Sequence, residues 1–140
     1  MDCKIVLFDC RGHSASCIKP LMLQPILFCP VMTWVSQELL NCGVQRFFVI
    51  CDEAFRDEFA AAMPGCEVTF FDTAAAAAAA CDGDVLVIPT PVLPVMAFGQ
   101  SPVYSVSGDL LRQICDNGTA LSICPAQGKE ELFWLPVHNV

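Results

Sequence analysis

The residues best suited to chemistry lie in one short loop near the start of the chain. An apolar segment, 4–8, leads into small and polar residues that include Asp9, Arg11 and Gly12. In many α/β nucleotide-binding folds, such a loop binds a phosphate through the backbone N–H groups of its turn. Gly12 is the only glycine of this loop, and a lone glycine does not by itself identify a nucleotide site.

Three side chains of the same region are of kinds that bind metals: Cys10, His13 and Cys17. Thiolate and imidazole groups suit zinc, but no fourth ligand is evident and no C-x-x-C pair occurs in the chain. Nothing in the sequence suggests secretion, so we interpret the ten cysteines as reduced thiols. Free cysteines commonly serve as small buried apolar residues. We therefore predict no metal site, with a thiol or zinc protein as the alternative.

The composition indicates one acidic domain. A chain of 140 residues can bury a hydrophobic core, and its net charge of −8 argues against nucleic-acid binding, which draws on Lys and Arg. The mean hydropathy of +0.56 is high, but prolines interrupt both long uncharged stretches, 20–37 and 85–108, so neither can form a spanning helix. Asp2 and Lys4 lead directly into the first strand without a signal peptide. We expect a cytoplasmic protein without a membrane partner.

Strand and helix patterns alternate along the chain. Helices are expected where apolar residues recur at helical spacing or where alanines cluster, and strands where short apolar runs lie between turn residues. We find no domain boundary and no internal repeat, and treat 1–140 as a single domain. The expected strands are 4–8, 44–51, 67–71, 84–88, 120–124 and, more weakly, 132–135; the expected helices are 31–42 (stopped by Gly43), one beginning at Asp52, one capped by Asp72-Thr73, and 108–116; residues 17–30 are expected to form a loop, and 92–107 to be irregular or partly stranded.

This alternation predicts an α/β fold with a three-layer, Rossmann-like architecture, in which a mostly parallel sheet carries helices on both faces. Ligands of such sheets bind beyond the carboxyl ends of the strands. The candidate site therefore comprises the segments 8–16, 51–52, 72–73 and 89–94.

Over about residues 4–95, several short segments follow the order and spacing of one known family. The chain resembles the sugar-phosphate nucleotidyltransferases with the GT-A-like fold, most of all the uridylyltransferase domain that makes UDP-N-acetylglucosamine. The resemblance rests on Ile5-Val6-Leu7 (the first strand), 28–32 with Trp34-Val35 (the K-P-M segment and its helix), Gly43-Val44 and 47–50 (the helix stop and second strand), Asp72-Thr73 with its alanines (the G-T-x-x-A segment) and 83–88 (the strand that delivers the G-D dipeptide).

The resemblance implies a nucleoside triphosphate and a sugar phosphate as ligands, and Mg²⁺ as cofactor if the domain is active. It also implies that the chain is truncated relative to the family. It assigns no catalytic residue. The nucleotide-binding residues that it implies are Leu7, Arg11, Gly12, Lys19, Asp72 and Thr73.

The chain departs from the family pattern where the chemistry is done. In the signature L-A-A-G-x-G-T-R-M, Cys10 replaces a glycine, Ser14 replaces the arginine, and Asp9 adds a carboxylate that repels phosphate. The metal-binding aspartate falls on Thr90 or Pro91. These losses predict a nucleotidyltransferase-like domain with little or no activity, which retains either nucleotide binding or a partner-binding role.

The alternative is an active uridylyl- or thymidylyltransferase with relocated ligands. In that case Arg11 and Lys19 bind the phosphates, and Asp9 or Asp84 binds the metal. The uncharged, proline-rich segment from Pro89 to Phe98 (PTPVLPVMAF) is either a surface for a protein partner or a second copy, or a buried loop under a helix.

Overall fold

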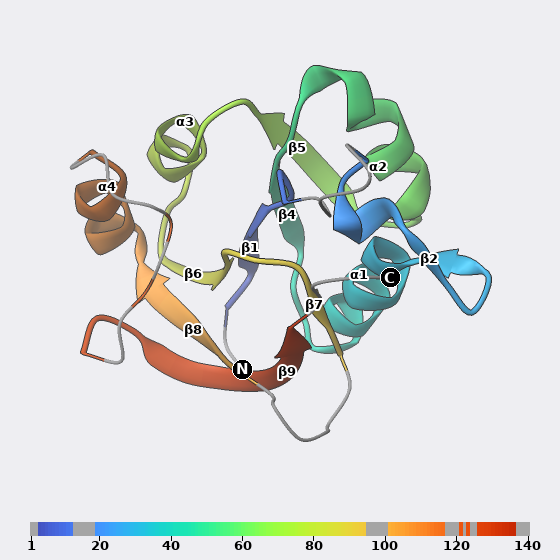
Figure 1. Ribbon diagram of the computed structural model, residues 1–140. Coiled ribbons are helices and arrows are strands. Elements are labelled where there is room, and N and C mark those ends of the chain that lie inside the picture. Colours follow the sequence, from blue (N-terminus) through green and yellow to red (C-terminus); the bar gives the residue numbers. More distant parts are fainter. Residues whose placement is uncertain are drawn as a thin grey trace.

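The computed structural model describes residues 3–12, 19–94, 101–116, 121, 123 and 126–136. A seven-stranded sheet with the order β5-β4-β1-β6-β8-β9-β7 forms the middle layer (Figure 1). The strands are β1 (Ile5–Asp9), β4 (Arg46–Ile50), β5 (Glu67–Phe71), β6 (Asp84–Ile88), β7 (Val92–Leu93), β8 (Ser101–Ser107) and β9 (Lys129–Pro136). The helices are α1 (Val31–Asn41), α2 (Arg56–Ala62), α3 (Ala74–Ala79) and α4 (Gly108–Asp116).

Most of the sheet is parallel. β1 pairs in parallel with both β4 and β6, and β4 pairs in parallel with β5. β8 is antiparallel to β6 and β9, and β7 is antiparallel to β9, so only β7 and β8 run against the other strands. The predicted α/β class with a mostly parallel sheet is confirmed.

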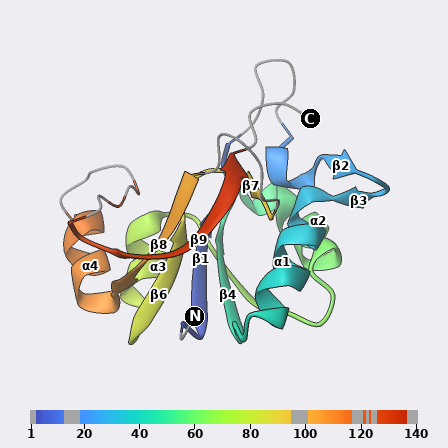
Figure 2. The ribbon, with the colours of Figure 1, turned by 90° about the horizontal axis from the view of Figure 1, so that it is seen from below.

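Helices cover both faces of the sheet. Figure 2 shows α1 and α2 on one side and α3 and α4 on the other. The side chains of β1 alternate accordingly, because successive residues of a strand point to opposite faces. Val6 and Phe8 belong to the core under α1 and α2, whereas Ile5 and Leu7 belong to the core under α3 and α4. The predicted three-layer arrangement is therefore confirmed as well.

The helix predicted over 31–42 forms as α1, and Gly43 ends it as expected. Gly43 has a φ of 98°, which a residue without Cβ adopts at little cost. Its N–H donates to the carbonyl of Leu40 (3.1 Å), and the N–H of Val44 donates to the carbonyl of Leu39 (3.0 Å). These two bonds form a Schellman motif, which satisfies carbonyl groups at the end of the helix.

The structure differs from the expected elements at two places. The expected loop 17–30 contains a short helix, η1 (Leu21–Leu23), and a hairpin of β2 (Pro25–Ile26) and β3 (Cys29–Pro30). Asp52 makes no side-chain cap bond; a short helix, η2 (Glu53–Phe55), follows it, and α2 begins after that. The segment 92–107 is partly stranded, as expected: it contains β7 and β8, and β8 pairs with β6 and β9.

The predicted strand 120–124 falls mostly outside the described residues. Leu121 and Ile123 are described, and both are buried in the core under α3 and α4. None of the helices in the described ranges reaches the length and hydrophobicity that crossing a membrane requires.

Candidate functional site

The predicted site segments meet at one edge of the sheet. The carboxyl ends of β1, β4, β5 and β6 are aligned by their register: Asp9 lies opposite Ile50, Ile50 opposite Phe71, and Phe8 opposite Ile88. The segments that follow these strands therefore emerge side by side. We call this region the strand-end edge, formed by residues 9–12, 51–52, 72–73 and 89–91.

Arg11, the first cation of the strand-end edge, is bound by the carboxylate of Asp9. Its Nε donates to Oδ1 over 2.9 Å and its Nη2 donates to Oδ2 over 2.8 Å. The backbone N–H of Arg11 also donates to Oδ1, over 3.2 Å. The hydrogen bonds to Asp9 raise the pKa of the guanidinium. A two-pronged contact of this kind matches the planar geometry of both groups and occupies the Nε–Nη2 edge of the guanidinium.

Gly12 brings the loop after β1 against the segment after β6. A Cβ placed on Gly12 would lie 3.4 Å from two ring carbons of Pro91. The carbonyl of Gly12 accepts a hydrogen bond from the N–H of Leu21 over 2.9 Å. Gly12 therefore lies against both η1 and Pro91, and a Cβ at this position would come into van der Waals contact with the proline ring.

Lys19 and Asp72, two further predicted site residues, are also engaged in ion pairs. The Nζ of Lys19 lies 3.0 Å from Oε2 of Glu58 on α2. Asp72 accepts a hydrogen bond from Nη2 of Arg56 over 2.6 Å. Each of these two side chains thus faces a partner of opposite charge from the same chain, and that of Lys19 lies on α2.

Arg56 is a residue of this region that the sequence analysis missed. Besides contacting Asp72, its guanidinium lies 5.9 Å from the centre of the Phe70 ring. Its Nε is buried and has no hydrogen-bond partner within the described part of the chain. No local pattern links Arg56 to Asp72, since β5 has to return beside β4 before the two can meet.

Thr73 and Leu7 have local structural roles. The Oγ1 of Thr73 accepts a hydrogen bond from the N–H of Ala76 over 3.2 Å and so caps α3, as the sequence predicts. The side chain of Leu7 is fully buried under α3 and α4.

Two cysteines, Cys10 and Cys51, follow β1 and β4 at this edge and are buried. Burial raises the pKa of the Cys10 thiol well above its ordinary value, and burial raises the pKa of Cys51 to about 11. At neutral pH both are therefore neutral thiols, which are poor nucleophiles and poor metal ligands.

Within the described residues, the strand-end edge brings together no set of side chains for a divalent cation: no three His, Cys, Asp or Glu side chains are grouped so as to hold a metal ion. Asp9, a carboxylate that Mg²⁺ would need, is already bound by Arg11. His13 and Cys17, the other members of the considered zinc site, lie outside the described residues.

The cations in and around the strand-end edge are paired with carboxylates of the same chain. Asp52 adds a further negative charge at the end of β4. A phosphate that approached Arg11 would therefore also approach carboxylates of its own sign. Phe8, directly beneath the edge, is packed in the core.

Comparisons with known proteins give similarities of structure alone. No protein-family model matches the chain, and no curated protein matches it. The chain is similar to a nucleotidyl transferase from Methanothermobacter (Mth528), with a TM-score of 0.46 and 18% identity over 80% of this chain and 56% of that one. It therefore spans little more than half of that protein. It is also similar to Rv0371c from Mycobacterium tuberculosis H37Rv, with a TM-score of 0.49 and 18% identity over 94% of this chain and 70% of that one.

Proposed function

We propose that the chain is a nucleotidyltransferase-like domain that works through contact with protein and performs no nucleotidyl transfer. The order of the family-like segments supports the nucleotidyltransferase-like part of this proposal. The ion pairs of the strand-end edge support the part of the proposal that denies nucleotidyl transfer.

The pairing of Arg11 with Asp9 carries the proposal. Transfer of a nucleotidyl group requires cations that neutralise the charge developing on the phosphates. Arg11 is the cation nearest in the sequence to the position of the signature arginine, and the Nε and Nη2 donors of its guanidinium are bound by Asp9. The same carboxylate that neutralises Arg11 would repel an incoming triphosphate.

The proposal is tested by a coupled pyrophosphate-release assay. The chain is incubated with Mg²⁺, with UTP or TTP, and with a panel of sugar 1-phosphates. We expect no release above that of a control without protein. Turnover that disappears in Arg11→Ala would overturn the proposal and establish the active transferase with relocated ligands.

Isothermal titration with UTP, with and without Mg²⁺, tests nucleotide binding separately. We expect no heat of binding and no thermal shift at millimolar nucleotide. An Asp9→Asn variant sharpens the result, because it frees Arg11 and removes one repelling charge. Binding that appears only in Asp9→Asn would show that the internal ion pair blocks the edge, whereas binding by the unaltered chain would contradict a purely protein-binding role.

A further inference from the structure

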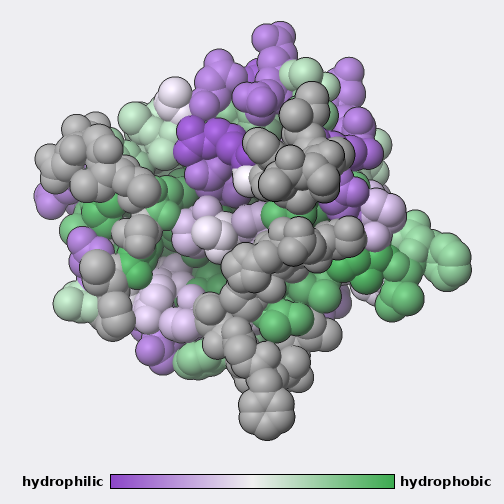
Figure 3. Space-filling model, in the orientation of Figure 1, coloured by the Kyte–Doolittle hydropathy of each residue, from purple (hydrophilic) through white to green (hydrophobic). Residues whose placement is uncertain are grey.

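The hairpin of β2 and β3 projects from the body of the protein and ends in two large apolar residues. In Figure 1 it stands clear of the helices, and Figure 3 shows the same projection as hydrophobic. At its tip Leu27 is 74% exposed and Phe28 is 101% exposed. The Phe28 ring is therefore not covered by any described part of the chain, and it contributes nothing to the core.

The backbone at this tip adopts a conformation that these residues disfavour. Leu27 has a φ of 50° and Phe28 a φ of 79°. A two-residue hairpin turn with both φ values positive is usually built from Asn and Gly, because a Cβ is crowded in this conformation. Strain of this kind persists where the surroundings impose it, and it is concentrated at functional positions.

The base of the hairpin is fixed to α1. The indole Nε1 of Trp34 donates to the carbonyl of Ile26 over 2.8 Å, and the N–H of Val31 donates to the carbonyl of Gln24 over 2.9 Å. These bonds hold the two strands at the start of the helix. The tip is consequently presented in one position.

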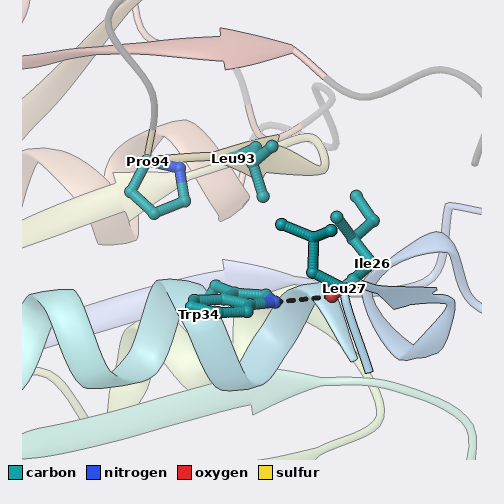
Figure 4. A pocket seen from close by; sticks show the side chains of 5 residues that line it. All are labelled: Ile26, Leu27, Trp34, Leu93 and Pro94. Carbon is teal, nitrogen blue, oxygen red and sulfur yellow. Dashed lines mark hydrogen bonds between the residues drawn. The ribbon is translucent and has the colours of Figure 1, made fainter. Parts of the chain in front are cut away.

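An apolar pocket of about 220 Å³ lies beside the hairpin. Figure 4 shows the ring of Trp34 along one side, Ile26 and Leu27 from the hairpin on another, and Leu93 and Pro94 above them. None of the five lining residues is charged. An apolar cavity of about 150 Å³ is large enough for benzene, so this pocket can receive a phenyl ring.

The ring and the pocket are complementary parts of one surface. Phe28 does not fill the pocket of its own chain, since its ring is fully exposed. In a symmetric dimer, however, the same surface of both copies meets, and each copy can supply a ring to the pocket of the other. We call this surface the hairpin patch, formed by Ile26, Leu27, Phe28, Trp34, Leu93 and Pro94.

Charge and area restrict how two copies can meet. Each chain has a net charge of −8, so association is least opposed through an uncharged surface such as the hairpin patch. Trp34 is 40% exposed, and together with Leu27 and Phe28 it offers roughly 400 Å² per copy. Stable interfaces take about 800 Å² from each partner. The area therefore suits a weak, reversible dimer.

We propose that the chain forms a symmetric dimer in which Phe28 of each copy enters the pocket of the other between Trp34 and Pro94. Two residues of the 89–98 segment, Leu93 and Pro94, then contribute to the interface. Residues 95–98 lie outside the described part of the chain. This dimer does not depend on the absence of nucleotidyl transfer.

Sedimentation velocity from low micromolar to near-millimolar concentration tests the dimer. We expect the sedimentation coefficient of the unaltered chain to rise with concentration, and more strongly at high salt, which screens the repulsion between the two acidic chains. In Phe28→Asn, which suits the positive φ, the association constant should fall by at least about tenfold. Phe133→Asn, which removes an exposed aromatic ring outside the pocket lining, should leave it unchanged.

Photo-cross-linking provides a second test that does not depend on the stability of a variant. The photoreactive analogue p-benzoylphenylalanine replaces Phe28, and the protein is mixed with an isotope-labelled copy. Cross-links from residue 28 to Trp34 or Leu93 should join labelled and unlabelled chains. A chain that stays monomeric, a dimer that persists in Phe28→Asn, or cross-links confined within one chain would overturn the proposal.

Discussion

The strand-end edge contains charged side chains that are paired with one another, whereas the hairpin patch contains apolar side chains that are exposed to solvent. At the strand-end edge, Arg11 is paired with Asp9 and Arg56 is paired with Asp72. At the hairpin patch, large apolar side chains face solvent and the backbone is strained.

The two regions differ in whether their side chains find partners within the chain. In the ion pairs of the strand-end edge, charges of opposite sign from the chain itself neutralise one another. The exposed Phe28 contributes nothing to the core, and we therefore propose that it contacts a second copy of the chain. Four changes test this comparison, from the largest expected effect to the smallest.

Phe8→Ala tests whether the region under the strand-end edge is structural core. Phe8 is fully buried, and replacing such a ring by Ala typically costs about 3–5 kcal/mol of unfolding free energy. Urea unfolding measures the loss. Phe133→Ala, at a ring that is 44% exposed, should cost clearly less, about 1–1.5 kcal/mol. Equal losses of stability in the two variants would contradict the packing of Phe8 in the core beneath the strand-end edge.

The buried thiol of Cys51 predicts a loss of stability in alkali. Burial raises its pKa in the folded chain from 9.0 to about 11. A group whose folded pKa is raised stabilises the fold fully below its unfolded pKa, and this stabilisation disappears as the pH rises through the folded pKa. Two pKa units correspond to about 2–3 kcal/mol.

Urea unfolding at about pH 8 and about pH 10.5 measures this effect. Cys51→Ala should be less stable than the unaltered chain at the lower pH, but its stability should decline less between the two. A decline of equal size in both proteins would show that Cys51 is not desolvated at the end of β4.

Replacing the hairpin tip by Leu27→Asn with Phe28→Gly tests the strain. Because Asn and Gly suit a turn with two positive φ values, we expect the unfolding free energy to rise by about 1–2 kcal/mol. Urea unfolding at low protein concentration, where the chain is monomeric, is the measurement. A decrease in stability would mean that the side chains of Leu27 and Phe28 stabilise the single chain, which would contradict our interpretation of the hairpin patch.

Thr73→Ala tests whether this predicted site residue is a helix cap. Loss of the bond from Ala76 to Oγ1 should cost about 1 kcal/mol. Thr90→Ala, at an exposed threonine after β6, is the matched control and should have little effect. If the two substitutions were equivalent in urea unfolding, the capping role of Thr73 would be wrong.

The sequence predicted the parts of the fold that local patterns determine. The continuous apolar runs of β1, β4 and β6 identify strands buried on both faces. The helical spacing up to Gly43 identifies α1. The convergence of Asp9, Asp52 and Asp72 at one edge then follows, because parallel strands end together.

Local patterns could not show which charges pair. Arg56 meets Asp72 only because β5 returns beside β4, and Arg11 meets Asp9 through a turn whose geometry its residue types do not fix. The hairpin was also missed, since Leu27 and Phe28 lack the Asn-Gly signal of a tight turn. The β8–β9 pairing depends on contacts between distant segments, which short-range propensity does not encode.

One NMR experiment compares the two regions directly: proton–nitrogen correlation spectra of the chain on dilution and on addition of UTP with Mg²⁺. We predict that dilution shifts the Trp34 indole signal and the amide signals of Leu27 and Phe28, and that the nucleotide leaves Arg11 and Thr73 unchanged. Nucleotide-dependent shifts at Arg11 and Thr73, with a hairpin patch insensitive to dilution, would contradict the account.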